Sequence, residues 1–116
     1  MISTTLQDLF GGKAAEAVLL SLFHHGYIHG RDIAREFTVS LDAVQRQLDR
    51  FECSGTLVCQ RQGRPLVYSW NPKSRLATRL RDLTGVVYDG LDPEAKEALF
   101  TDRRQPRAKD KPVIRG

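Results

Sequence analysis

The stretch SLDAVQRQLDRF, Ser40 to Phe51, decides the fold that the sequence predicts. An α-helix turns by about 100° per residue, so it places the large apolar residues of this stretch within an arc of about 80°: Leu41, Val44, Leu48 and Phe51. Arg46 falls almost opposite that arc, surrounded by Asp42, Ala43 and Arg50. We therefore expect one face of this helix to pack on a core and the other to be wet and charged.

A second, shorter helix is predicted just upstream, in RDIAREF (31–37), where Ile33, Ala34 and Phe37 repeat at helical spacing. Only TVS separates the two helices, and Ser40 is well placed to cap the second by accepting from backbone N–H groups. Two helices joined by three residues do not lie side by side comfortably. We expect them to cross steeply, with Val39 filling the corner, as a helix-turn-helix.

The hydrophobic period changes after Gly55. TLVCQR (56–61) and PLVYSW (65–70) are rich in β-branched and aromatic residues, which favour strands. Between them, QGRP supplies the glycine and proline of a tight connection. The pattern predicts a β-hairpin with Arg61 and Arg64 near its tip.

Further helices are expected on both sides. TTLQDLF (4–10) forms a short helix with Leu6, Leu9 and Phe10 on one side, and residues 13–25 form a central helix that Gly26 ends. After Pro72 a stripe predicts a helix up to Gly90: Leu76, Leu80, Leu83 and Val87. Asp92 and Pro93 open a last helix to Phe100. The fold class is mainly α with a small β-hairpin, as one domain over 1–100, whereas 101–116 lacks an apolar period and is predicted to be a disordered basic tail.

Positive charge is segregated along the chain. The net charge is +4, but residues 31–81 carry +5 and the tail carries +4, whereas residues 1–30 and 82–100 carry −1 and −4. A basic middle and tail favour a polyanionic partner.

Several classes of protein are disfavoured by the sequence. The apolar run AAEAVLLSLF is too short to span a bilayer and contains Glu16, and no basic segment with a cleavage site precedes it, so we expect a cytoplasmic protein away from membranes. No nucleophile elbow, phosphate-binding loop or GxGxxG is present, so we expect no enzyme activity and no cofactor.

The histidines and cysteines do not match metal-site patterns. His24 and His25 are adjacent, so their rings diverge by about 100° on a helix, and with His29 they are interpreted as helix-end or surface residues rather than metal ligands. Cys53 and Cys59 are not spaced as CxxC, so we expect two unpaired thiols, with a redox switch as the alternative.

The segment REFTVSLDAVQRQLDRFECSGTLVCQRQGRPLVYSWNP (35–72) resembles the helix-turn-helix and wing of small prokaryotic winged-helix transcriptional regulators of the ArsR/MarR-like superfamily. LFGGKAAEAVLLSLF resembles their opening helix, so the likeness covers roughly Leu9 to Pro72. The resemblance implies a winged helix-turn-helix with helix 40–53 in the DNA major groove and wing 60–66 on the backbone or minor groove. The DNA-binding positions that it implies are Ser40, Asp42, Ala43, Gln45, Arg46 and Arg50 on the helix and Arg61, Gln62 and Arg64 on the wing.

Side-chain chemistry is consistent with these roles. Arg46 and Arg50, one turn apart, present donor forks that suit guanine or phosphate, and Gln45 suits adenine. Arg64 suits a narrow, electronegative minor groove, and two residues of the preceding helix suit phosphates: Arg31 and Arg35.

Three features depart from the family pattern. Asp42 and Asp49 repel phosphates unless they accept from cytosine N4 or orient an arginine, so we expect moderate affinity. Thr38 stands where such turns place glycine, and it would be strained at positive φ. The wing is short and carries few charges.

The terminal helices, at about 73–100 with the first helix, predict a homodimer through Leu6, Leu9, Leu76, Leu80, Leu83 and Val87. The alternative is that Leu76 and Leu80 cover their own core. The functional hypothesis is a homodimeric repressor that reads an inverted repeat in double-stranded DNA. Its alternative is a protein–protein interaction module whose basic tail touches nucleic acid, and the sequence indicates no effector.

Overall fold

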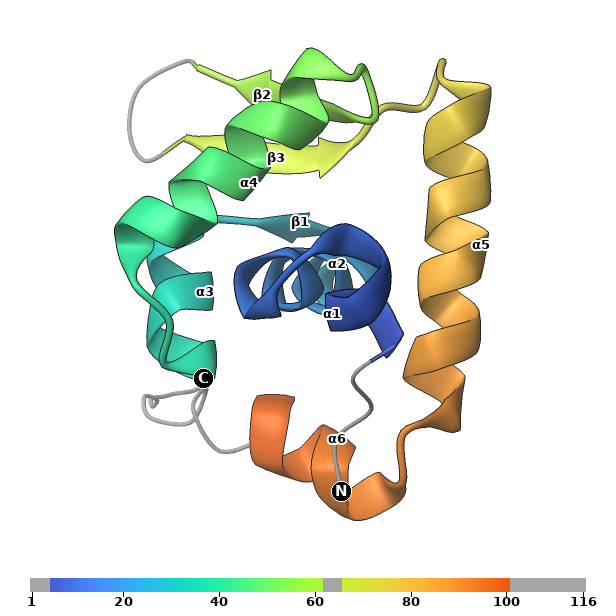
Figure 1. The fold of residues 1–116 in the computed structure, drawn as a ribbon. Helices are drawn as coiled ribbons and strands as arrows, with labels where there is room; N and C mark the ends of the chain where they lie inside the picture. Colours follow the sequence, from blue (N-terminus) through green and yellow to red (C-terminus); the bar gives the residue numbers. More distant parts are fainter. Residues whose placement is uncertain (1–4, 62–65, 101–116) are drawn as a thin grey trace, which may run out of the picture.

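The computed structural model describes residues 5–61 and 66–100. The chain is mainly helical with a small antiparallel sheet, which confirms the predicted fold class at that level (Figure 1). In chain order the elements are α1 (Thr5–Phe10), α2 (Lys13–His25), β1 (Tyr27–Ile28), α3 (Gly30–Phe37), α4 (Leu41–Cys53), β2 (Leu57–Gln60), β3 (Val67–Trp70), α5 (Arg75–Gly90) and α6 (Pro93–Phe100). Gln62, Arg64 and the predicted basic tail lie outside the described residues.

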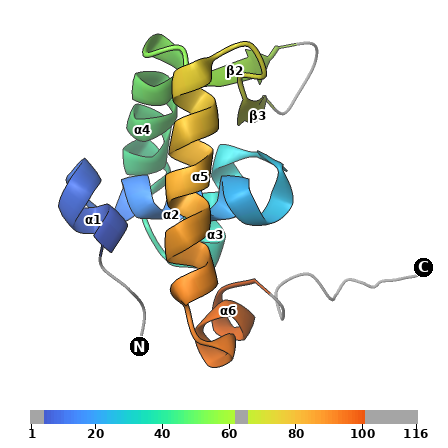
Figure 2. The same ribbon diagram turned by 90° about the vertical axis from the view of Figure 1, so that its right-hand side faces the viewer.

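The central helix is α2, as the sequence predicts. Every residue from Ala15 to Leu22 is buried, because α1, α3, α4 and α5 all pack around this helix (Figures 1 and 2). Gly26 ends α2 in the left-handed conformation at φ 86°, a backbone geometry that glycine adopts without steric cost.

The joint between α1 and α2 contains a buried acid. Gln7 Nε2 donates to Glu16 Oε1 at 2.8 Å, while Glu16 Oε2 has no hydrogen-bond partner among the described residues. Burial raises the pKa of Glu16, against the opposing effects of the Gln7 hydrogen bond and the Lys13 charge. The charged form of this side chain is therefore disfavoured by the fold.

The turn between α3 and α4 has a strained residue. Thr38 ends α3 in the left-handed conformation, at φ 55° and ψ 48°, where a β-branched side chain crowds its own backbone. Ser40 then caps α4, and its Oγ accepts from the Ala43 N–H at 3.0 Å, as predicted. The turn keeps the three-residue length of the predicted helix-turn-helix.

The inner face of α4 differs from the prediction at one end. Val44, Leu48 and Phe51 are buried, but Leu41 is 47% exposed. Leu41 is the first residue of α4 and lies near Gly30 of α3, which has no side chain to cover it. The apolar stripe therefore covers the core with three residues instead of four.

The predicted β-hairpin is present, and it belongs to a three-stranded sheet. β2 and β3 pair antiparallel from Leu57↔Trp70 to Gln60↔Val67. β1, for which Sequence analysis predicts no strand, pairs with the other side of β3, giving the order β1-β3-β2. β3, residues 67–70, is therefore the middle strand of the sheet.

The long helix α5 runs along one side of the molecule, and α6 turns back toward α3 (Figure 1). Ser74 caps α5, so this helix begins at Arg75, slightly after Pro72. The predicted cap of α6 is confirmed, because Asp92 Oδ1 accepts from the Ala95 N–H at 2.8 Å. No helix within the described ranges is long and apolar enough to cross a membrane.

The side of α5 that faces the core is not the leucine stripe alone. Its buried residues are Ala77, Leu80, Thr84 and Gly85. A Cβ at Gly85 would lie 2.8 Å from Phe23 Cε1, so glycine at this position allows the ring of α2 to approach the backbone of α5. Leu76 and Leu83 are left exposed.

Candidate nucleic-acid interface

The solvent-facing side of α4 presents an ion pair. Arg46 Nη1 lies 3.1 Å from Asp42 Oδ2, and their side chains are 68% and 83% exposed. The prediction that Arg46 faces solvent is confirmed, but its guanidinium is partly neutralised by the aspartate one turn before it. Residues 41–53 carry a net charge of −1. This face is therefore polar and of mixed sign.

Arg50 has other contacts than Arg46. Its Nη1 donates to Gln47 Oε1 at 2.9 Å, and the side chain lines the groove between α4 and α5. The helical period places Arg46 and Arg50 in successive turns, and each guanidinium is bound to a different side chain of α4, Asp42 for Arg46 and Gln47 for Arg50.

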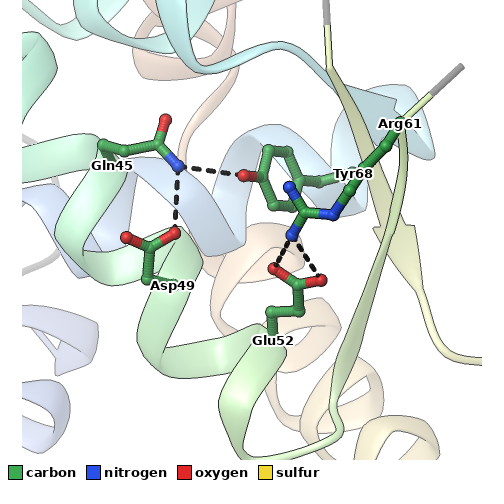
Figure 3. Close-up of polar contacts among 5 residues, drawn as sticks. All are labelled: Gln45, Asp49, Glu52, Arg61 and Tyr68. Atoms are coloured by element: carbon green, nitrogen blue, oxygen red, sulfur yellow. Dashed lines mark hydrogen bonds and ion pairs between the residues drawn. The ribbon is translucent and has the colours of Figure 1, made fainter.

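Gln45 is held by an internal hydrogen-bond network (Figure 3). Its Nε2 donates to Tyr68 Oη of β3 at 2.9 Å and to Asp49 Oδ1 at 3.0 Å. Burial raises the pKa of Tyr68, and the hydrogen bond from Gln45 partly offsets this effect, so the hydroxyl stays protonated at neutral pH. The Gln45 side-chain amide, which is predicted from the sequence to contact adenine, instead joins α4 to the sheet.

The basic residue of the hairpin is also tied to α4 (Figure 3). Arg61 Nη2 lies 2.7 Å and 2.8 Å from the two carboxylate oxygens of Glu52. The Glu52 carboxylate raises the pKa of Arg61, so this guanidinium keeps its charge at all physiological pH values. Arg61 remains 57% exposed, so solvent reaches the pair.

The remaining predicted contact residues lie on α3 and at the start of α4. Arg35 Nη2 pairs with Asp32 Oδ1 at 2.7 Å, and Arg31 is exposed. Ser40 is exposed but its Oγ is used by the cap, and Ala43 is half-buried. The predicted contact residues that the structure describes therefore lie on neighbouring elements. Three of them, Arg35, Arg46 and Arg61, are already paired with carboxylates of this chain.

Sequence reasoning missed the residues that join α4 to the hairpin. Tyr68 is 1% exposed and accepts from Gln45, and no feature of the sequence predicted this partner. Glu52 lies on the flank of α4, and no local pattern assigned it to Arg61. The one sequence signal for this ion pair was the opposite charge of Glu52, near the end of α4, and Arg61, just after β2.

The histidines make separate contacts. His24 Nδ1 lies 2.7 Å from Tyr88 Oη, and His29 Nδ1 lies 3.1 Å from the Leu66 carbonyl oxygen. His25 Nε2 lies 3.9 Å from the Glu36 carboxylate, beside a cavity of about 190 Å³. Among residues 5–61 and 66–100, no three potential metal ligands lie close enough together to hold an ion. Both cysteines of the sequence are free.

An apolar groove of about 440 Å³ lies between α1, α4 and α5. Figure 2 shows α5 with α1 and α4 to one side of it. The apolar lining is Phe10, Phe51, Leu76, Leu80 and Leu83, and the two cations on the lining are Arg50 and Arg79.

The residues predicted for a dimer interface separate into two groups. Leu6 is completely buried and Leu80 is 9% exposed, so both belong to the core of their own chain. Leu9, Leu76 and Leu83 are 59%, 60% and 38% exposed, and Val87 is half-buried. The structure thus leaves three of the predicted interface residues on the surface.

Comparison of the chain with protein-family models, curated proteins and solved structures found no match to any of them.

Proposed function

We propose that this chain is a sequence-specific DNA-binding transcriptional regulator of the winged-helix kind, acting in the cytoplasm. The observation that carries the proposal is a pair of solvent-exposed cations on α4 and on the hairpin, two elements that a hydrogen bond joins. Arg46 of α4 and Arg61 after β2 are 68% and 57% exposed. The Gln45–Tyr68 hydrogen bond joins α4 to the sheet and does not involve either cation. A polyanion can therefore reach both guanidinium groups while α4 stays attached to the sheet.

DNA would bind by exchange of ion-pair partners. An exposed i,i+4 pair such as Asp42–Arg46 is worth only about 0.3–0.5 kcal/mol, so a phosphate or a guanine edge can displace the aspartate. The same exchange at Arg61 releases Glu52 and lets the hairpin contact the backbone. In this proposal, Arg35 of α3 contributes a further phosphate contact that fixes the register of α4.

The carboxylates on the same surface limit non-specific affinity. Asp42 and Asp49 lie on the exposed side of α4 and repel phosphates at every sequence. A correct base pair recovers part of this cost, because a carboxylate can accept from cytosine N4 or hold an arginine in place. The arrangement favours discrimination between sequences over strong binding.

The proposal is tested by selecting bound duplexes from a random DNA pool and measuring their affinity by fluorescence anisotropy at several salt concentrations. We expect a recurring sequence, and log affinity that falls with log salt by about 0.9 for each phosphate contact. Arg46→Ala should cost about 1–3 kcal/mol at one base position. Arg81→Ala, which removes the same charge from α5, is the matched control and should leave sequence preference unchanged. Salt-insensitive binding without a preferred duplex would contradict the proposal.

A protein–protein interaction module is the second candidate function. It is favoured by the net charge of −1 on α4 and by the pairing of Arg46 and Arg61 with acids of the same chain. A protein partner tolerates such a self-neutralised surface better than a phosphate backbone does. Weak, sequence-independent DNA binding that needs residues 101–116 would select this second function.

A further inference from the structure

The apolar groove between α1, α4 and α5 is formed by side chains that pack within the chain (Figure 2). Two of its lining residues, Phe51 and Leu80, are each 9% exposed and belong to the hydrophobic core. The Phe10 ring meets the Phe51 ring edge to face, with their centroids 6.3 Å apart. Leu76 and Leu83, two turns apart on α5, are 60% and 38% exposed and complete the apolar lining. The groove therefore gives a partner about 440 Å³ of space above a fixed apolar base.

Each of the α4 and α5 walls of the groove carries a cation that its own chain binds only weakly. Arg50 of α4 donates to the neutral amide oxygen of Gln47 at 2.9 Å. Arg79 of α5 lies 3.5 Å from Asp82, and because these side chains are 76% and 64% exposed, solvent screens the pair. No aspartate or glutamate is among the described residues that line the groove. The lining therefore favours an anionic partner.

The apolar surface is longer than the groove itself. Val86, one turn beyond Leu83 on the same side of α5, is 71% exposed, and Leu9, beside Phe10 in α1, is 59% exposed. At 1.5 Å per residue, the helix from Leu76 to Val86 extends over about 15 Å. About three turns of a partner helix are needed to cover this length, which is more than a small ligand provides.

We propose that the groove binds an acidic amphipathic helix of another protein. Large apolar side chains of that helix, spaced three and four residues apart, enter the groove above Phe51 and Leu80. Acidic side chains on the two edges of the same helix then reach Arg50 on one wall and Arg79 on the other. This inference does not rest on the proposed DNA binding, and it gives Arg50 a protein partner instead of a DNA contact.

Other occupants match the groove less well. A second copy that pairs groove to groove brings four guanidinium groups, those of Arg50 and Arg79 in each chain, around one apolar space. Residues 101–116 carry +4, so the same arginines repel them. A DNA duplex neutralises the arginines but offers no apolar side chains to the leucines and phenylalanines of the lining. An acidic amphipathic helix matches both the apolar and the cationic part.

The proposal is tested with a fluorescein-labelled helical peptide of about 14 residues, added to the full chain without DNA. Its leucines are spaced four and three residues apart, and glutamates flank them. We expect saturable binding by fluorescence anisotropy. Lysines in place of the glutamates should weaken binding at least roughly tenfold, because both groove arginines then repel the peptide. Serines in place of the leucines should also weaken it at least roughly tenfold.

Variants of the chain locate the binding site. Arg79→Glu should weaken binding of the acidic peptide roughly tenfold and strengthen binding of the lysine peptide, because it reverses the charge of one wall. Arg81→Glu makes the same change on α5 outside the groove lining, so it should leave both affinities within about a factor of two. Leu76→Ser should weaken the acidic peptide roughly tenfold, whereas Val58→Ser on the exposed side of β2 should not. Circular dichroism checks that each variant is folded.

Three results would overturn the proposal. The first is equal binding of the acidic and lysine peptides, or binding of neither. The second is a wild-type dimer in sedimentation equilibrium that Leu76→Ser dissociates, because the groove then belongs to a second copy. The third is a random duplex, and not the peptide, whose affinity falls with Arg79→Glu. Failure of the peptide test leaves the proposed DNA contacts of Arg46 and Arg61 standing, since none of these variants alters those residues.

Discussion

Replacing Asp42 by asparagine should move stability and DNA affinity in opposite directions. Asp42 is in the first turn of α4, where an acid interacts favourably with the helix dipole, and it pairs with Arg46 at 3.1 Å. Loss of the dipole interaction costs about 0.3–1 kcal/mol and loss of the exposed pair about 0.3–0.5 kcal/mol. We therefore expect Asp42→Asn to lower the free energy of unfolding by about 1 kcal/mol, which lowers Tm by about 4 °C.

DNA affinity should rise at the same time. A carboxylate about 6 Å from a phosphate repels it by about 0.7 kcal/mol at the dielectric constant of water. With the release of Arg46 from its aspartate, the gain totals about 1 kcal/mol, or roughly a fivefold lower Kd for a duplex of random sequence. The slope of log affinity against log salt should stay nearly the same, because Arg46 makes the same DNA contact in both proteins once DNA has displaced Asp42.

The measurement combines thermal unfolding with fluorescence anisotropy at low salt. Asp8→Asn is the matched control, because Asp8 is an exposed first-turn acid of another helix, α1, and its replacement removes the same charge without touching the Asp42–Arg46 pair. We expect the control to leave Kd within a factor of two. An Asp42→Asn variant that loses stability without gaining affinity would refute the reasoning that this face meets phosphates.

Three further changes test other parts of the structure. Glu52→Gln should release Arg61 and strengthen binding to a random duplex roughly threefold by anisotropy, and unchanged binding would mean that the hairpin does not contact DNA. Gly85→Ala should destabilise the fold by about 1 kcal/mol in urea titrations, since the crowding of Phe23 outweighs the better helix propensity of alanine. The raised pKa of Glu16 means that its favourable contribution is complete below its unfolded pKa of about 4.5 and is lost as pH rises through the higher folded value. Glu16→Gln should therefore have a higher Tm than wild type at pH 7, and the difference should narrow on acidification; a pH-independent difference would contradict this assignment.

The helix ends were predictable because their causes are local. Gly26, Ser40 and Asp92 act on backbone groups within four residues of themselves, and the structure confirms all three. The hairpin was predictable for a similar reason, since its two strands are adjacent in the chain. In each case, the sequence segment contains both interacting partners.

The sheet and the surface chemistry were less predictable because they depend on contacts between distant segments. Two residues of β1 carry no periodic signal, and their pairing partner lies in β3. Helical spacing places Arg50 and Gln45 on the outer half of α4, but Gln47 and Tyr68 decide where their polar ends point. Periodicity thus predicts the direction of a Cβ but not the position of a guanidinium or an amide.

Thr38 couples the local unfolding of α3 to that of α4. A left-handed threonine persists only while its surroundings impose it, and here those surroundings are α3 and α4 packed against α2. When either helix detaches from α2, Thr38 can leave the left-handed conformation. The strain energy of the native turn is then released, which lowers the free energy needed to detach the other helix. We expect amide protons of α3 and α4 to exchange with deuterium as one cooperative unit.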